Sequence, residues 1–311
     1  MKNIAIALHG GAGTITRAAL SAEQEKAYKA ALREAAEAGH RLLQEGKPAL
    51  DAVELAVVLL EDNTLFNAGR GSVFTKEGKH EMDAAIMCGS TLEAGAVAGV
   101  QGVRNPVALA RAVMQYSDHV LLSGGGAAEF ARNHNIPSAP ESYFFNAFRY
   151  KQWSEVRDSD EFMLDHTEQP DKKFGTVGAV AVDLDGNVAA ATSTGGMTNK
   201  RYSRIGDTPL IGAGTYANNK TCAISCTGHG EFFMRAVVAY DVSCLMEYKG
   251  YSLQQACDEV VLRKLVQFGG EGGLVAVNAA GDVALPFNSE GMYRASKSNS
   301  EATFVGIYKE G

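Results

Sequence analysis

The stretch Gly175-Thr176-Val177-Gly178-Ala179-Val180-Ala181-Val182 decides the fold. After Thr176 its residues are small and apolar without interruption, which predicts a strand over 176–183 that is buried on both faces. Asp185-Gly186 follows at once and is a hairpin signal, so 187–194 is expected to return as a second strand. A buried hairpin therefore begins at Thr176.

The segment directly before this hairpin has a different character. Residues 158–173 carry many Asp, Glu and Lys side chains and show little apolar periodicity. Such a composition buries little surface, so it predicts a mobile linker. The chain therefore passes from an exposed linker into a buried strand at Gly175-Thr176.

This junction suggests chemistry at Thr176. A threonine hydroxyl is a weak nucleophile that needs an adjacent base. Cleavage before Thr176 would free its α-amine, whose pKa of about 8 suits a base near neutral pH. Gly175 has no side chain to block attack on its carbonyl, and the β-branch of threonine restricts the hydroxyl. The alternative is that Thr176 is simply a structural residue at the start of a strand.

The rest of the chain alternates groups of strands with pairs of helices. This order favours mixed α+β layers over regular βαβ alternation. Capping boxes at Ser21/Gln24 and Ser252/Gln255 mark two of the helix starts. Strands are expected at 2–8, 81–88, 94–103, 176–183, 187–194, 222–226, 273–278, 281–285 and 303–308. Helices are expected between Ser21 and Gly46, from Pro48 through Leu60, and at 106–116, 125–134, 138–157, 230–247 and 252–266.

Composition excludes several classes of function. The chain has 311 residues, a net charge of −7 and no basic stripe, which argues against a nucleic-acid partner. No apolar run is long enough for a membrane helix, and the apolar run at the start is too short for a signal peptide. Its five cysteines are irregularly spaced, which predicts free thiols and a cytoplasmic location rather than disulfides or zinc. The 34 glycines form clusters, as in tight turns or close approaches to a ligand.

The segment His9-Gly10-Gly11-Ala12-Gly13 is similar to the oxyanion segment of lipases and esterases. That class also needs a Gly-x-Ser-x-Gly elbow, which this sequence lacks. The glycine clusters also fail to match a phosphate-binding loop. His9 is therefore expected in a structural turn that ends the first strand.

Three blocks together carry a family resemblance: Gly175 to Ala181, Ala191-Thr192-Ser193-Thr194-Gly195-Gly196-Met197 and Arg204-Ile205-Gly206-Asp207-Thr208-Pro209. On these blocks the chain resembles the plant-type L-asparaginase/isoaspartyl peptidase family of N-terminal-nucleophile hydrolases. The resemblance runs from the His9 segment to Phe287-Asn288-Ser289-Glu290-Gly291-Met292. It implies a four-layer αββα sandwich with the nucleophile at the start of a central strand.

The resemblance also implies that the chain cleaves itself between Gly175 and Thr176. The products would be an α chain, 1–175, ending in the linker at about 158–175, and a β chain, 176–311, which together form one domain. Thr176 would then attack L-asparagine or a β-aspartyl dipeptide and form an acyl-enzyme. No cofactor is required for this chemistry. The products would assemble as an (αβ)2 heterotetramer.

The resemblance assigns roles to further residues. Thr194 would support the nucleophile by hydrogen bonding, while Thr227 and the backbone N–H of Gly228 would form the oxyanion hole. Arg204 would hold the substrate α-carboxylate and Asp207 its α-ammonium, with Gly228 and Gly230 beside them. Taken without the resemblance, Arg204 and Asp207 could form a surface ion pair, which is the usual case for two such residues.

A structural sodium ion is also implied, in a loop that resembles one binding through main-chain carbonyls. The expected ligands are Leu60, Glu61, Asn63, Phe66, Ala68 and Arg70. Asn67 lies in the same block and could approach the nucleophile.

One residue departs from the family pattern. His229 stands where the family often has a smaller polar residue, and either alters substrate preference or points to solvent.

The second function class is an unprocessed, non-catalytic relative that binds amino-acid ligands through Arg204 and Asp207.

Overall fold

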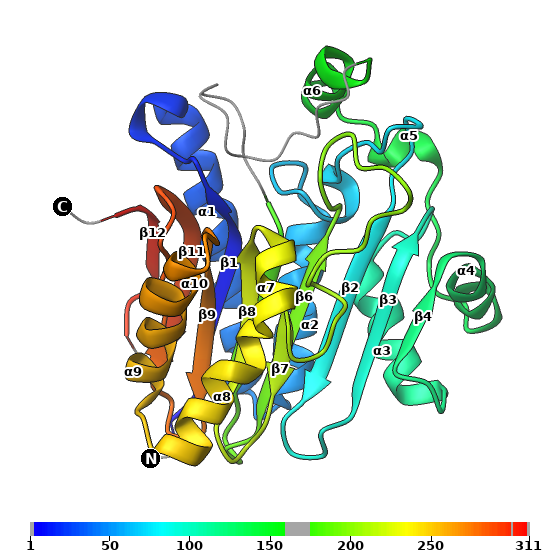
Figure 1. Cartoon of the computed structure of the whole chain (residues 1–311). Helices are drawn as coiled ribbons and strands as arrows, with labels where there is room; N and C mark the ends of the chain where they lie inside the picture. Colours follow the sequence, from blue (N-terminus) through cyan, green and yellow to red (C-terminus); the bar gives the residue numbers. More distant parts are fainter. Residues whose placement is uncertain (1–2, 159–174, 300, 310–311) are drawn as a thin grey trace.

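The computed structural model describes residues 3–158, 175–299 and 301–309. Most of the predicted linker, residues 159–174, lies outside this part of the chain. The described residues form two β-sheets with helices packed on them (Figure 1). The strands are β1 Ala5–Gly13, β2 Met82–Cys88, β3 Ala94–Val100, β4 Leu121–Ser123, β5 Val177–Val182, β6 Val188–Thr194, β7 Thr215–Ala217, β8 Cys222–Gly228, β9 Gly272–Asn278, β10 Val283–Ala284, β11 Gly291–Ser298 and β12 Phe304–Tyr308.

The larger sheet has eight strands in the order β12-β11-β1-β5-β6-β2-β3-β4, and the smaller has four in the order β10-β9-β8-β7. Within these sheets the pairing of β3 with β4 is parallel, and the other strand pairs are antiparallel. The predicted hairpin is confirmed as β5 and β6, with Val177 opposite Ser193 and Val182 opposite Val188. β5 lies in the middle of the larger sheet, between β1 and β6.

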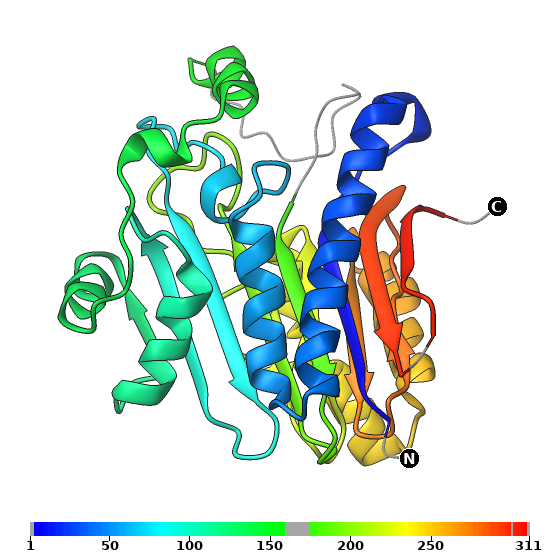
Figure 2. The ribbon, with the colours of Figure 1, turned by 180° about the vertical axis from the view of Figure 1, so that it is seen from behind.

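The helices cover both sheets. Figure 2 shows α1, α2 and α3 lying across the larger sheet, where α1 contacts β1 and β11, α2 contacts β5 and β6, and α3 contacts β2 and β3. On the smaller sheet, α8 contacts β7 and β8, and α9 contacts β9 and β10. The helices are η1 Arg17–Ala19, α1 Ala22–Gln44, α2 Ala49–Glu61, η2 Gly69–Gly71, α3 Pro106–Tyr116, α4 Gly124–Asn133, α5 Glu141–Phe144, α6 Ala147–Val156, α7 Gly230–Ala236, α8 Val238–Lys249, α9 Leu253–Asp258, the π-helical η3 Glu259–Lys264 and α10 Leu265–Gln267.

Alternation along the strands separates three apolar clusters. On β1, Ile6 and Leu8 pack with the helices of the larger sheet, whereas Ala5 and Ala7 face the smaller sheet. On β8, Ile224 packs with the helices of the smaller sheet, and Ala223 faces the larger one. Since side chains alternate across a strand, each of these strands presents one apolar face to its helices and the other to the opposite sheet. This explains why the central strands read as unbroken apolar runs.

Most predicted elements are confirmed, including both capping boxes at Ser21 and Ser252. Three strands were not predicted: β4, β7 and β11. β4 and β7 have only three residues each, too few for a periodic signal. The sequence of β11, GMYRASKS, contains polar residues, but Arg294 packs over the Phe287 ring instead of breaking the strand.

Other predicted boundaries were wrong. β1 does not end at His9 but continues to Gly13, through a register shift between His9 and Gly11. The predicted helix 138–157 is two helices, α5 and α6, and 230–247 is divided at Val237, whose φ is 50°. The predicted helix 252–266 changes to π-helical geometry at Glu259. Within the described residues, no helix combines the length and apolar character needed to span a membrane.

Candidate active site

The site lies where the chain enters β5. Thr176 is half-buried just before this fully buried strand. Its hydroxyl donates a hydrogen bond to Thr194 Oγ1 at 3.1 Å. Thr194 ends β6, and its Oγ1 also accepts from the backbone N–H of Gly196 at 3.0 Å. The antiparallel hairpin therefore brings together two threonines that are 18 residues apart in sequence.

The predicted cleavage bond packs tightly against Asn67. A Cβ at Gly175 would lie 2.7 Å from the Asn67 backbone nitrogen, so only glycine fits there. Asn67 Nδ2 donates to the Gly196 carbonyl at 2.6 Å, and its Oδ1 accepts from the Val73 N–H at 3.0 Å. Asn67 thus ties its loop to the turn after Thr194, and it approaches Gly175 at the backbone.

A small cavity joins most of the predicted residues. Thr227 is not among its lining residues; this side chain is buried, and its Oγ1 accepts a hydrogen bond from the Ala12 N–H at 3.3 Å. Gly228 does line the cavity, with a φ of 149° that favours glycine. The lining residues are Thr176, Thr194, Gly196, Met197, Arg204, Gly206, Asp207, Thr208, Gly228, His229 and Gly230.

Arg204 and Asp207 lie beside one another at the wall of this cavity. A Cβ at Gly230 would lie 2.7 Å from Asp207 Oδ1 and 2.8 Å from Arg204 Nη2. A Cβ at Gly206 would lie 2.7 Å from Arg204 Nη1. Side chains in place of these two glycines would therefore press on the charged ends of Arg204 and Asp207.

Sequence reasoning missed the partner of Arg204. Glu231 accepts from Arg204 Nε at 2.7 Å and from Nη2 at 2.6 Å. Burial alone would raise the pKa of Glu231, but the hydrogen bonds and charge of Arg204 hold it below its usual value. Arg204 therefore meets a ligand with two of its nitrogens already engaged. The only sequence signal was an acidic residue in the first turn of α7.

Asp207 is buried, and one oxygen of its carboxylate lacks a hydrogen-bond partner among the described residues. Burial raises the pKa of Asp207 to about 7, although the charge of Arg204 opposes the shift. Among the described residues, Oδ2 of Asp207 has no hydrogen-bond partner. A buried unpaired carboxylate is costly, so this oxygen is suited to receive a cationic ligand group.

His229 belongs to the site and does not simply point to solvent. Its Nε2 lies 3.4 Å from Glu231 Oε2, and its ring packs edge-on against Phe232 with centroids 4.8 Å apart. A second cavity, of about 360 Å³, adjoins the first and shares Met197, Arg204 and His229 with it. Its further lining residues are Lys200, Arg201, Tyr202 and Glu231.

His9 also has a different place from the predicted turn. It lies within β1, fully buried, with Nδ1 3.0 Å from the Thr176 carbonyl oxygen and Nε2 2.8 Å from Ser225 Oγ. The ring therefore contacts the backbone of Thr176.

The predicted sodium loop folds back on itself around η2. Three of its carbonyls accept backbone hydrogen bonds: Leu60 from Asn63, Asn63 from Phe66 and Ala68 from Gly71. A Cβ at Gly69 would lie 2.5 Å from the Glu61 carbonyl oxygen, and one at Gly71 would lie 2.0 Å from that of Phe66. The described residues contain no cluster of His, Cys, Asp and Glu side chains that could hold a metal.

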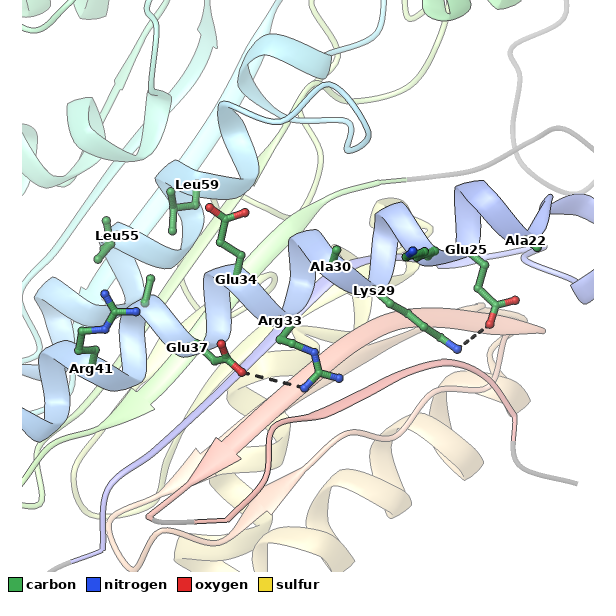
Figure 3. A pocket seen from close by; sticks show the side chains of 12 residues that line it. Ala22, Glu25, Lys29, Ala30, Arg33, Glu34, Glu37, Arg41, Leu55 and Leu59 are labelled. Atoms are coloured by element: carbon green, nitrogen blue, oxygen red, sulfur yellow. Dashed lines mark hydrogen bonds and ion pairs between the residues drawn. The ribbon is translucent and has the colours of Figure 1, made fainter.

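Figure 3 shows a broad groove on the outer face of α1 and α2, on the helical side of the larger sheet. Two ion pairs lie along α1 in this groove, Lys29 with Glu25 and Arg33 with Glu37. None of the residues discussed above lines it. The groove therefore adds nothing to the candidate site.

Comparisons with known proteins show the family of the chain. A family model described as Asparaginase matches residues 2–307. The chain is 54% identical to a protein named isoaspartyl peptidase from Salmonella typhimurium, over all of both chains. It is 52% identical to one of the same name from Escherichia coli, covering all of this chain and 98% of that one. It is 42% identical to a plant-type L-asparaginase from Pyrococcus horikoshii, covering 98% of this chain and all of that one.

Proposed function

Because the chain belongs to the Asparaginase family, we propose that it is a hydrolase that cleaves L-asparagine and β-aspartyl dipeptides after cutting itself before Thr176. The observation that carries this proposal is the contact of Thr176 with Thr194 on a cavity that also presents Arg204 and Asp207. A nucleophile and a binding pair for a zwitterion thus share one small space. The names of the relatives favour this function over that of an unprocessed amino-acid binder.

Maturation begins at the Gly175 carbonyl. The Thr176 hydroxyl adds to this carbon, the bond from the carbon to the Thr176 nitrogen breaks, and the nitrogen leaves as an amine. Water then hydrolyses the resulting ester and frees the Gly175 carboxylate. The tight packing of Gly175 on Asn67 supports this step, because it leaves the scissile group little freedom to move.

In the mature form the freed amine takes the proton of the Thr176 hydroxyl. Oγ1 attacks the substrate carbonyl, and ammonia or an amino acid leaves with a proton from the amine. Water then releases aspartate from the acyl-enzyme. The Ala12 N–H donates to Thr227 Oγ1, so the proton of that hydroxyl remains available for the oxyanion, together with the Gly228 N–H.

Substrate recognition follows from charge. The Arg204 guanidinium would take the α-carboxylate, and the unpaired oxygen of Asp207 would take the α-ammonium. The adjoining cavity offers room for the amino acid that leaves from a β-aspartyl dipeptide, whereas the ammonia released from asparagine would leave it empty.

A structural sodium ion, with no cofactor for the chemistry, is part of the proposal. The carbonyls of Leu60, Glu61, Asn63, Phe66, Ala68 and Arg70 would bind it. The close approach of the Glu61 carbonyl to Gly69 and of the Phe66 carbonyl to Gly71 supports this assignment, because a side chain at either glycine would displace the carbonyl. The ion would hold the loop that positions Asn67.

We further propose an αββα sandwich, built as one domain from chains 1–175 and 176–311 and assembled as (αβ)2. The separation of three apolar clusters by two sheets supports the sandwich. A cytoplasmic location is supported by five free thiols at Cys88, Cys222, Cys226, Cys244 and Cys257.

The test compares kinetics on L-asparagine and a β-aspartyl dipeptide, using material shown to be cleaved. Release of aspartate from either substrate, absent in Thr176→Ala, is expected. Cleaved protein that hydrolyses neither substrate would refute the enzyme, and protein that stays uncut and binds aspartate would favour the binder.

A further inference from the structure

A chain of buried polar side chains runs beneath the nucleophile and ends on its carbonyl. His9 on β1 contacts both the Thr176 carbonyl and Ser225 Oγ on β8. Thr192 on β6 lies 2.7 Å from Ser225, and Thr215 on β7 lies 2.7 Å from Thr192, between hydroxyl oxygens. All four side chains are fully buried, and the chain crosses from one sheet to the other.

The direction of each hydrogen bond follows from one group that can only accept. The Thr176 carbonyl must receive a proton, so His9 Nδ1 carries one. Burial lowers the pKa of His9 to about 3, despite the hydrogen bond to Thr176, so the ring is neutral and Nε2 is bare. Ser225 therefore donates to Nε2.

The same reasoning orders the hydroxyls. Because Ser225 has given its proton to His9, Thr192 must donate to Ser225, and Thr215 must donate to Thr192 across their 2.7 Å contact. The Thr208 carbonyl competes for the Thr215 proton at the longer distance of 3.1 Å. Every short contact then holds one proton, as a buried network requires.

The backbone is shaped to admit this network. A Cβ at Gly178 would lie 1.9 Å from Ser225 Oγ and 2.6 Å from His9 Nε2, so a side chain there would displace both. The register shift after His9 is a second feature of the backbone that admits the network, because irregularities of this kind change the direction of side chains. The contact between His9 and Ser225 thus explains the glycine at position 178.

We propose that His9, in the Nδ1–H tautomer set by Ser225, is a positioning residue that fixes the Thr176 backbone for catalysis. Cleavage removes the peptide bond that tethers Thr176 on one side, and free chain ends fray. Two side-chain contacts then hold the new terminus: Thr194 on the hydroxyl and His9 on the carbonyl. This inference rests on the proposed role of Thr176 as the nucleophile.

The kinetic test uses three substitutions in cleaved protein: His9→Asn, His9→Gln and His9→Phe. The Asn amide nitrogen can occupy the place of Nδ1 and keep the donor to Thr176, whereas Gln places its amide near Nε2, and Phe has no donor. We expect His9→Gln and His9→Phe to lose on the order of 100-fold in kcat, as misplacement of a reacting group does. His9→Asn should recover most of this loss, and KM should change little in all three, since Arg204 and Asp207 are untouched.

A second measurement needs neither cleavage nor activity. In the uncut Thr176→Ala chain, nitrogen NMR should show His9 as the neutral Nδ1–H tautomer near neutral pH, assigned by its loss in His9→Asn. An Nε2–H tautomer or a charged ring would overturn the proposal. So would wild-type kcat in His9→Phe, or equal losses in all three variants that follow their melting temperatures. A wild-type protein inactive on both substrates would instead refute the proposed function, while the tautomer measurement would still decide the His9 geometry.

Discussion

Asp207 carries a buried charge that substrate binding should satisfy. Its carboxylate must be ionised to hold an ammonium, and burial raises its pKa to about 7. As pH falls through this value the free protein loses the charge. The freed Thr176 amine must also be unprotonated, and its ordinary pKa is about 8.

We therefore expect kcat/KM for L-asparagine to fall below neutral pH. A plot of log(kcat/KM) against pH should reach a limiting slope of about two, because two groups must lose protons. Asp207→Asn should have a lower kcat/KM at every pH. Its limiting slope should be about one, because only the Thr176 amine still has to lose a proton. Parallel pH profiles for the two proteins would contradict this role of Asp207.

Gly230 keeps the binding pair accessible. The methyl group of Gly230→Ala would lie within 3 Å of both Asp207 Oδ1 and Arg204 Nη2. KM for L-asparagine should rise by about tenfold or more, which corresponds to about 1.4 kcal/mol of binding free energy. Cleavage before Thr176 should proceed unchanged, since this pair does not contact the scissile bond. Gly125→Ala, at a position with open space around it, is the matched control and should leave KM unchanged.

The residues of the site could be predicted only in part. The Thr176 and Thr194 pair, Arg204 and Asp207 all line one cavity, as expected. Glu231 was missed because its pairing with Arg204 spans 27 residues and depends on how the loop that carries Arg204 meets the start of α7. The position of His9 was missed because a Gly-Gly pair normally ends a strand, whereas here a register shift carries the strand onward.

Among the elements, the junction of α7 and α8 holds a strained residue. Val237 has a φ of 50° and is 43% exposed, so its β-branched side chain occupies a left-handed conformation without the compensation of burial. Such a conformation costs about 1–2 kcal/mol. Periodicity alone predicted one helix here, because the apolar pattern continues across the break.

Val237→Gly should therefore raise the free energy of unfolding, by about 1 kcal/mol. Urea unfolding of the uncut Thr176→Ala chain would measure this on a single polypeptide. Val237→Ala keeps a Cβ in the same backbone conformation and should raise the free energy of unfolding by less than Val237→Gly does. A loss of stability in Val237→Gly would show that the backbone strain at this residue is smaller than the entropy cost of glycine.

At the scale of the whole molecule, the central strands could be predicted because they are apolar on both faces. On β5, Ala179 and Ala181 pack with the helices, while Val180 and Val182 face the smaller sheet. The edges were less predictable: β4 is a short edge strand, and β11 gains its partner β1 from the opposite end of the sequence. Contacts of that kind leave little local signal in a sequence.

The arrangement of the whole molecule places the start of β5 at the active cavity and the predicted linker immediately before it. The central claim is that this junction must be cut before catalysis begins. Intact-mass measurement under denaturing conditions, taken over time together with asparagine hydrolysis, tests it most directly. Two chains, 1–175 and 176–311, should appear in step with activity, the second beginning Thr-Val-Gly-Ala, while Thr176→Ala stays whole and inactive. Full activity in a preparation that remains one unbroken chain would contradict the account.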